Sequence, residues 1–116
     1  MTVQDCLFCK LLAGQVPANV VWKDDTVTAF RDINPQAPVH ILLIPNRHIA
    51  SASALTQADD ALAGALLRKA GELAESEGIA GSGYRVVTNT GRASGQSVDH
   101  LHLHLLGGRA MGWPPG

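Results

Sequence analysis

The spacing of apolar residues predicts one long helix, from about Ala58 to Glu77. Apolar side chains recur there as they do along one helix face, at Leu62, Leu66, Ala70 and Leu73. Thr56 can cap the start of this helix, with Asp59 serving as a variant of the capping box. Gly78 suits the position just past the helix end, where a left-handed backbone is common.

Short runs rich in β-branched and aromatic residues predict about five strands. These runs cover Val20–Trp22, Thr26–Phe30, His40–Ile44, Tyr84–Thr88 and His100–Leu106. Only a short turn at Asp24 and Asp25 separates the first two, which favours a hairpin and a mostly antiparallel sheet. A short helix over Cys6–Ala13, ended by Gly14, precedes them. We therefore expect an α+β fold in which the long helix covers one face of the sheet.

The last of these runs alternates His100, His102 and His104 with leucines. Only a strand sorts residues with a period of two, so the imidazoles are expected on one face and the leucines in the core. Lys, Thr or Glu would serve a merely solvated face more simply. Two functional interpretations remain. One is a metal site, because His-x-His spacing suits chelation. The other is a nucleophilic site, because imidazole attacks phosphorus at neutral pH and its adduct is labile.

Composition favours one compact domain over residues 1–116. Of the 116 residues, 46% are hydrophobic and 16% are charged, with a net charge of −1. Such a chain can build a core without disulfides. The absence of a basic patch argues against nucleic acid as a partner. No apolar run is long enough to cross a bilayer and no signal-peptide pattern is present, so we expect no membrane association and a cytoplasmic location.

A polar segment, Asn89–Ser97, directly precedes the histidine run. Its glycines, amides and hydroxyls offer what a phosphate cradle needs, namely small side chains and free main-chain N–H groups. By itself the segment is typical of a connecting loop. Its place before the histidines favours phosphate binding, with a neighbouring imidazole assisting at the phosphate or the leaving group.

The run His100–Leu106 matches the signature of the histidine-triad family, His-x-His-x-His followed by two apolar residues. Three more segments resemble the Hint branch of that family, the purine nucleoside phosphoramidases: Asp32–His40, Gly95–Ser97 and Trp113–Gly116. The resemblance extends from Cys6 to Gly116. It implies hydrolysis of the P–N bond of nucleoside 5′-phosphoramidates, adenosine preferred, through a nucleotidyl-histidine intermediate.

The resemblance also implies roles for individual residues. His102 would be the nucleophile, His104 would contact the phosphate and assist proton transfer, and His40 would support that proton network. The nucleotide would be bound by Phe8, Leu11 and Phe30 at the base, Asp32 and Ile33 at the ribose, and Asn89, Gly95, Gln96 and Ser97 at the phosphate, Ser97 also assisting catalysis. Without the resemblance, the apolar residues would be interpreted as core and Asp32 as a turn residue.

Cys6 and Cys9 form a CxxC pair with three interpretations. A redox motif lacks the expected βαβ surroundings, and two ordinary buried cysteines are possible. The third interpretation is half of a zinc site, completed by His48 and His100. The distantly related galactose-1-phosphate uridylyltransferases carry a structural zinc on such a set, whereas other Hint proteins lack the cysteines. We expect a structural zinc that fixes His100 and takes no part in the chemistry.

Two alternative functions stay open from the sequence. One is a dinucleoside polyphosphate hydrolase, against which the Trp113–Gly116 end argues, and the other is a nucleotide- or zinc-binding regulatory module with little turnover. The Hint resemblance also implies a homodimer. Small residues on the long helix, Ala61, Gly64 and Ala65, would permit close approach of a partner.

Overall fold

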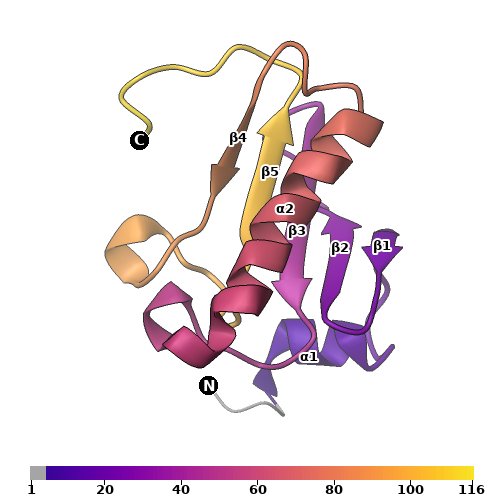
Figure 1. Cartoon of the computed structure of the whole chain (residues 1–116), viewed down its shortest axis with the longest axis vertical. Helices are drawn as coiled ribbons and strands as arrows, with labels where there is room; N and C mark the ends of the chain where they lie inside the picture. Colours follow the sequence, from indigo (N-terminus) through magenta and orange to yellow (C-terminus); the bar gives the residue numbers. More distant parts are fainter. Residues whose placement is uncertain (1–4) are drawn as a thin grey trace.

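A computed structural model describes residues 5–116 and shows an antiparallel sheet with helices on both sides (Figure 1). The elements, in chain order, are α1 (Leu7–Leu12), β1 (Val20–Lys23), β2 (Val27–Arg31), β3 (Val39–Pro45), the short 3-10 turns η2 (Ala52–Ala54) and η3 (Gln57–Asp59), α2 (Asp60–Ser76), β4 (Tyr84–Val87), η4 (Arg92–Ser94) and β5 (Leu103–Gly107). In this part of the chain the sheet has five strands in the order β1-β2-β3-β5-β4. All four pairings are antiparallel, so the predicted α+β architecture is confirmed.

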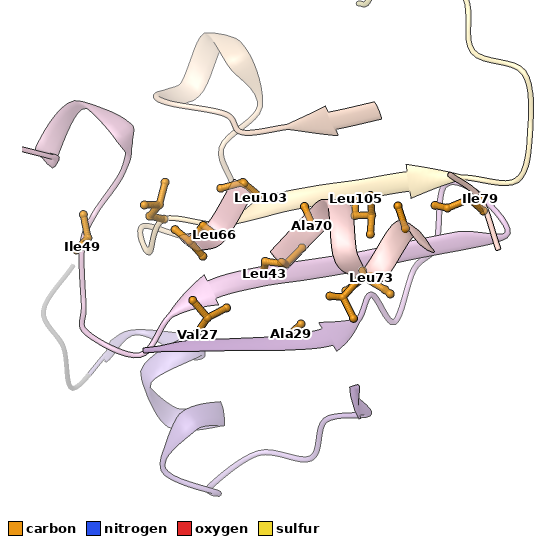
Figure 2. Packing of buried hydrophobic residues seen from close by; sticks show 13 residues of the cluster. Val27, Ala29, Leu43, Ile49, Leu66, Ala70, Leu73, Ile79, Leu103 and Leu105 are labelled. Atoms are coloured by element: carbon orange, nitrogen blue, oxygen red, sulfur yellow. The ribbon is translucent and has the colours of Figure 1, made fainter. Parts of the chain in front are cut away.

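One face of the sheet carries the larger core, beneath α2. Because side chains alternate along a strand, Ala29, Leu43 and Leu105 all point to the same side. Figure 2 shows these side chains converging on Leu66, Ala70 and Leu73 of α2. The predicted apolar face of the long helix is therefore confirmed, and Leu103 and Leu105 of β5 do pack beneath it.

The opposite face carries a second, smaller core built around α1. Phe8 of α1 packs there against Phe30, Leu42 and Ile44, which alternate with the residues of the larger core. Three of the sequence's histidines, at positions 40, 102 and 104, occur at alternate positions that share this face with Leu42. The sheet therefore separates an apolar side beneath α2 from a side on which histidines meet α1.

The long helix and its caps follow the sequence prediction closely. The Thr56–Asp59 capping box is present, but it closes the 3-10 turn η3, and regular α2 begins one residue later at Asp60. Gly78 follows the helix with a φ of 76°, the left-handed conformation expected there. Within residues 5–116, no helix has the length and apolar character needed to cross a membrane.

The last strand is shorter than predicted. We expected it to run from His100, but β5 begins at Leu103. Pairing stops because the opposing strand β3 ends at Pro45, which has no N–H to continue the ladder. Leu101 instead donates its N–H to the carbonyl of Ile49 at 2.6 Å. The alternation of faces survives nonetheless, since Leu101 still joins the core beneath α2.

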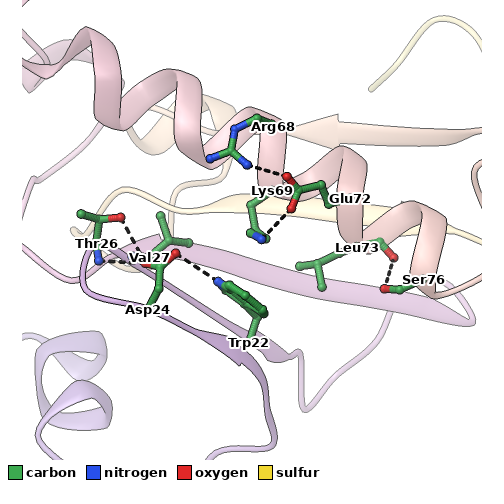
Figure 3. A network of polar contacts seen from close by, with 9 residues as sticks. All are labelled: Trp22, Asp24, Thr26, Val27, Arg68, Lys69, Glu72, Leu73 and Ser76. Atoms are coloured by element: carbon green, nitrogen blue, oxygen red, sulfur yellow. Dashed lines mark hydrogen bonds and ion pairs between the residues drawn. The ribbon is translucent and has the colours of Figure 1, made fainter.

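The edge strand β1 is tied to α2 by a polar network (Figure 3). The Lys69 ammonium lies 3.7 Å from the centroid of the Trp22 ring and 2.6 Å from a carboxylate oxygen of Glu72. Asp24 closes the β1–β2 turn by accepting the main-chain N–H groups of Thr26 and Val27, each at 2.8 Å. These contacts fix the edge farthest from β4 and leave the histidine face free.

Candidate active site and Cys-His cluster

A cavity of about 490 Å³ opens on the histidine face of the sheet, beside α1. It is large enough for a nucleotide-sized ligand. Some of the residues that line it were predicted from the sequence as site residues and others were not. The lining residues are Leu7, Phe8, Leu11, Val16, Pro17, Asp32, Ile33, Leu42, Ser97, Val98, His102 and His104. One wall is therefore apolar, while a carboxylate, a hydroxyl and two imidazoles face the same space.

His102 is held in one orientation by its own main chain. Its Nδ1 lies 2.7 Å from the carbonyl oxygen of His100, and a carbonyl can only accept, so Nδ1 carries the proton. In the neutral ring the lone pair is then on Nε2. The ring packs edge-on against Phe8, with centroids 5.2 Å apart. Among the described residues, every fully buried side-chain nitrogen or oxygen has a hydrogen-bond partner. His102 Nε2 has no such partner, so it is not fully buried, and it is open to the cavity that His102 lines.

His104 and His40 form a second pair of imidazoles on neighbouring strands. His40 Nε2 lies 2.9 Å from His104 Nδ1 and 3.5 Å from a carboxylate oxygen of Asp32. Burial lowers the pKa of His104 to about 4, helped by the nearby rings of His102 and His40. Burial also lowers the pKa of His40, and Asp32 opposes this only in part. Both rings are therefore neutral at neutral pH, and each carries one N–H donor and one acceptor nitrogen.

The loop before the histidines brings one predicted residue to the cavity and uses another internally. Ser97 lines the cavity. The side chain of Gln96 instead accepts the N–H of Gly91 at 2.9 Å and donates to the carbonyls of Ala50 at 2.9 Å and Val98 at 3.1 Å. The N–H of Gly91 can only donate and the two carbonyls can only accept, so these bonds fix the orientation of the Gln96 amide. The Gln96 side chain therefore holds the loop together. Asn89 and Gly95 belong to the same loop but do not line the cavity.

Two further residues complete the comparison with the sequence. Phe30 lies behind the cavity wall, with its ring centroid 5.4 Å from that of Phe8, so it supports the wall without lining it. Leu42 lines the cavity although the sequence did not single it out. It is the direct cross-strand partner of His104. That signal becomes visible only once β3 and β5 are known to be neighbours.

Cys6, Cys9, His48 and His100 meet behind the cavity with their ligand atoms turned toward one another. The Cys6 Sγ–His100 Nδ1 and Cys9 Sγ–His48 Nδ1 distances are both 3.3 Å, Cys9 Sγ–His100 Nδ1 is 3.6 Å, and the two Nδ1 atoms are 3.2 Å apart. A tetrahedral zinc with ordinary bond lengths places sulfur and nitrogen ligands about 3.6 Å apart and two nitrogens about 3.3 Å apart. The donor set and its spacing therefore fit zinc.

The protonation of His100 suits the same purpose. Its Nε2 lies 2.9 Å from the carbonyl of Pro45 and so carries the proton, which leaves the Nδ1 lone pair facing the cysteines. Without a metal, burial and the neighbouring Cys6 raise the pKa of Cys9 to about 11. A cation would reverse this preference, because a coordinating thiol gives up its proton.

Comparison with known proteins places this architecture in a family. The HIT domain model matches residues 13–111. An uncharacterized HIT-like protein of Synechocystis is 51% identical over 97% of this chain and 98% of its own length. The purine nucleoside phosphoramidase of Escherichia coli K12 is 46% identical over 94% of this chain and 92% of its own. The crystal structure of a HIT family hydrolase from Legionella pneumophila superposes with a TM-score of 0.95, at 51% identity, over 97% of this chain and 100% of the other. The chain belongs to the HIT domain family.

Proposed function

We propose that this protein hydrolyses the P–N bond of purine nucleoside 5′-phosphoramidates, adenosine preferred, and releases the nucleoside monophosphate. The orientation of His102 carries the proposal: its Nδ1–H is bound to a carbonyl at 2.7 Å, so the nucleophilic Nε2 faces the cavity. The phosphoramidase from Escherichia coli, at 46% identity, supports the same reaction.

The cavity wall suggests how the substrate lies. Phe8 and Leu11, supported by Phe30, would contact the base, and the Asp32 carboxylate would accept hydrogen bonds from the ribose hydroxyls with Ile33 beside it. Ser97 would donate its hydroxyl to the phosphate or the leaving group. The loop residues Asn89, Gly95 and Gln96 would contribute through the backbone and through the shape of the loop.

The reaction would proceed in two displacements at phosphorus. His102 Nε2 attacks, a P–Nε2 bond forms, the P–N bond of the substrate breaks, and the amine leaves after gaining a proton from solvent. Water then attacks the nucleotidyl-histidine: a P–O bond forms, the P–Nε2 bond breaks and returns its electron pair to His102, and the water gives up one proton, which balances the proton that the amine took up. His104 would donate its N–H to the phosphate oxygens or the leaving nitrogen, supported by His40.

Two further proposals concern the assembly. Zinc would bind Cys6, Cys9, His48 and His100 as a structural ion, since all four ligand positions are filled by protein. The protein would form a homodimer, which is supported by the exposed Gly64 and by Leu67, an apolar residue of α2 that is 59% exposed. A single domain and a cytoplasmic location stay predictions of the sequence.

Turnover of an adenosine 5′-phosphoramidate and of a diadenosine polyphosphate, measured side by side, tests the function. We expect His102→Ala to lower phosphoramidate turnover by several orders of magnitude, about 10⁵-fold or more, and to abolish the nucleotidyl adduct, while nucleotide binding is kept. His104→Ala should cost less, about 10²–10⁴-fold. Lys23→Gln, at an exposed position on the far edge strand, is the matched control.

The outcomes separate the alternatives. Mass spectrometry of enzyme quenched without acid should locate the adduct on His102. An adduct on His104 or His40 would reassign the nucleophile, and near-normal turnover by His102→Ala would refute the mechanism. Preference for the diadenosine compound would assign the protein to polyphosphate hydrolysis, and nucleotide binding with no turnover would make it a regulatory module.

A further inference from the structure

The loop between β2 and β3 brings a main-chain N–H group to the buried side of His40. The N–H of Gln36 lies 3.0 Å from His40 Nδ1. A peptide N–H can only donate, so this ring nitrogen must be the acceptor and cannot carry a proton in the neutral ring. The remaining proton of His40 is therefore on Nε2.

This assignment passes along the hydrogen-bond chain to His104. With its proton on Nε2, His40 donates to Nδ1 of His104 across 2.9 Å. His104 then accepts at Nδ1 and carries its own proton on Nε2. That atom has no hydrogen-bond partner in the described chain, and His104 lines the cavity. The main-chain N–H of Gln36 thus determines, through His40, which N–H His104 offers to a substrate.

Asp32 gives independent support for the proton on His40. Its carboxylate oxygen lies 3.5 Å from His40 Nε2, a position that suits a protonated nitrogen and would repel a lone pair. Asp32, His40 and His104 also lie within metal-ligand range of one another. A metal would need the lone pair of His40 Nε2, and the Gln36 N–H removes that form of the ring. The same contact therefore favours a proton relay over a second metal site.

Two further contacts hold Gln36 in place. Its carbonyl accepts the Nε–H of Arg109 at 2.9 Å, and its side-chain amide donates to the carbonyl of Asn34 at 3.1 Å. Asp32 also accepts the N–H of Asn34 at 2.8 Å, which shapes the start of the loop. The loop that presents the Asp32 carboxylate to the cavity thus also fixes the direction of the Gln36 N–H.

We propose that the main-chain N–H of Gln36 is a positioning group that fixes the tautomers of His40 and His104, so that His104 presents its Nε2–H to the phosphate or leaving group. The chemical use of that N–H rests on the proposed function. The tautomers themselves do not, so they can be tested in the resting protein.

The first test is a long-range ¹H–¹⁵N correlation spectrum of the uniformly ¹⁵N-labelled protein at pH 7, without nucleotide. We expect protonated Nε2 and bare Nδ1 on both His40 and His104. His102 should show the reverse, because its Nδ1 donates to a carbonyl at 2.7 Å, and it serves as the internal control. A proton on Nδ1 of His104 would overturn the proposal whether or not the protein cleaves phosphoramidates.

Two variants at one position then separate the N–H from the side chain. Gln36→Ala keeps the N–H and the Arg109 bond to its carbonyl and loses only the side-chain bond to Asn34, so it should keep the wild-type tautomer pattern. Gln36→Pro removes the N–H, so His40 can protonate at Nδ1 and the His104 resonances should shift toward a mixture. In a rapid-quench measurement, Gln36→Pro should form the nucleotidyl adduct about 10- to 100-fold more slowly than Gln36→Ala, with AMP affinity within about threefold. An unchanged His104 spectrum in folded Gln36→Pro would refute the assignment. If that variant does not fold, the wild-type spectrum decides.

Discussion

Mild acid is expected to destabilise this protein, and His104 is expected to supply a measurable share of the effect. Burial lowers the pKa of His104 to about 4, well below the value of about 6.5 for an unfolded chain. Between these two values the unfolded chain takes up a proton that the folded protein does not. The stabilising contribution of the neutral ring is therefore complete above about pH 6.5 and is lost as the pH falls toward 4.

The size of the effect follows from the two pKa values. Between pH 7.5 and 5.5, linkage gives at most about 1.4 kcal/mol for one such histidine. Because the ring borders an open cavity, solvent screening reduces this to about 1 kcal/mol. The window is chosen because Asp and Glu side chains stay largely ionised above about pH 5. Burial also lowers the pKa values of His40 and His100, so the wild-type protein should lose more stability over this pH range than His104 alone accounts for.

Urea unfolding at pH 7.5 and 5.5, at one protein concentration and ionic strength, measures the effect. We expect His104→Gln to lose about 1 kcal/mol less stability than the wild type on going from pH 7.5 to 5.5. Lys23→Gln is the control, because a lysine keeps its charge across this window and its removal should shift both measurements equally. An identical pH dependence in the wild type and His104→Gln would refute the reasoning.

Two further predictions concern the metal and the assembly. Protein purified without chelators should contain about one zinc per chain. Cys9→Ser should lose both the metal and thermal stability, because one of four ligands is removed. A stable, metal-free wild type would show that the cysteines are ordinary buried residues. Sedimentation equilibrium at micromolar concentration should give twice the chain mass, and a monomer throughout would remove the dimer proposal.

The sequence predicted the faces of the fold better than its element ends. Alternation from His100 to Leu105 placed the histidines and leucines on opposite sides, and this holds even where regular β5 has not begun. The early end of pairing depends on Pro45 in another strand, a long-range effect that the alternating pattern does not contain. The Thr56–Asp59 cap was predictable because it is local, and only its 3-10 character was missed.

The candidate site was predictable only where side-chain chemistry revealed it. The histidines, Asp32 and the CxxC pair are visible as residue types in the sequence. The contact between His40 and His104 requires β3 and β5 to be neighbours, and the strand order β1-β2-β3-β5-β4 is not the order along the chain. The contribution of Gln36 comes from its main chain, which every residue except proline shares, so no residue type could have indicated it.

Helix α1 explains why a structural metal would lie so close to a nucleotide cavity. A helix of only six residues cannot be stable by itself, so contacts must hold it against the sheet. Phe8 and Leu11 face the cavity, while Cys6 and Cys9 face His48 and His100. A metal there would fasten the apolar wall of the cavity to His100, whose carbonyl orients the ring of His102. The ion would then affect the reaction only by fixing the position of the apolar wall relative to the attacking Nε2 of His102.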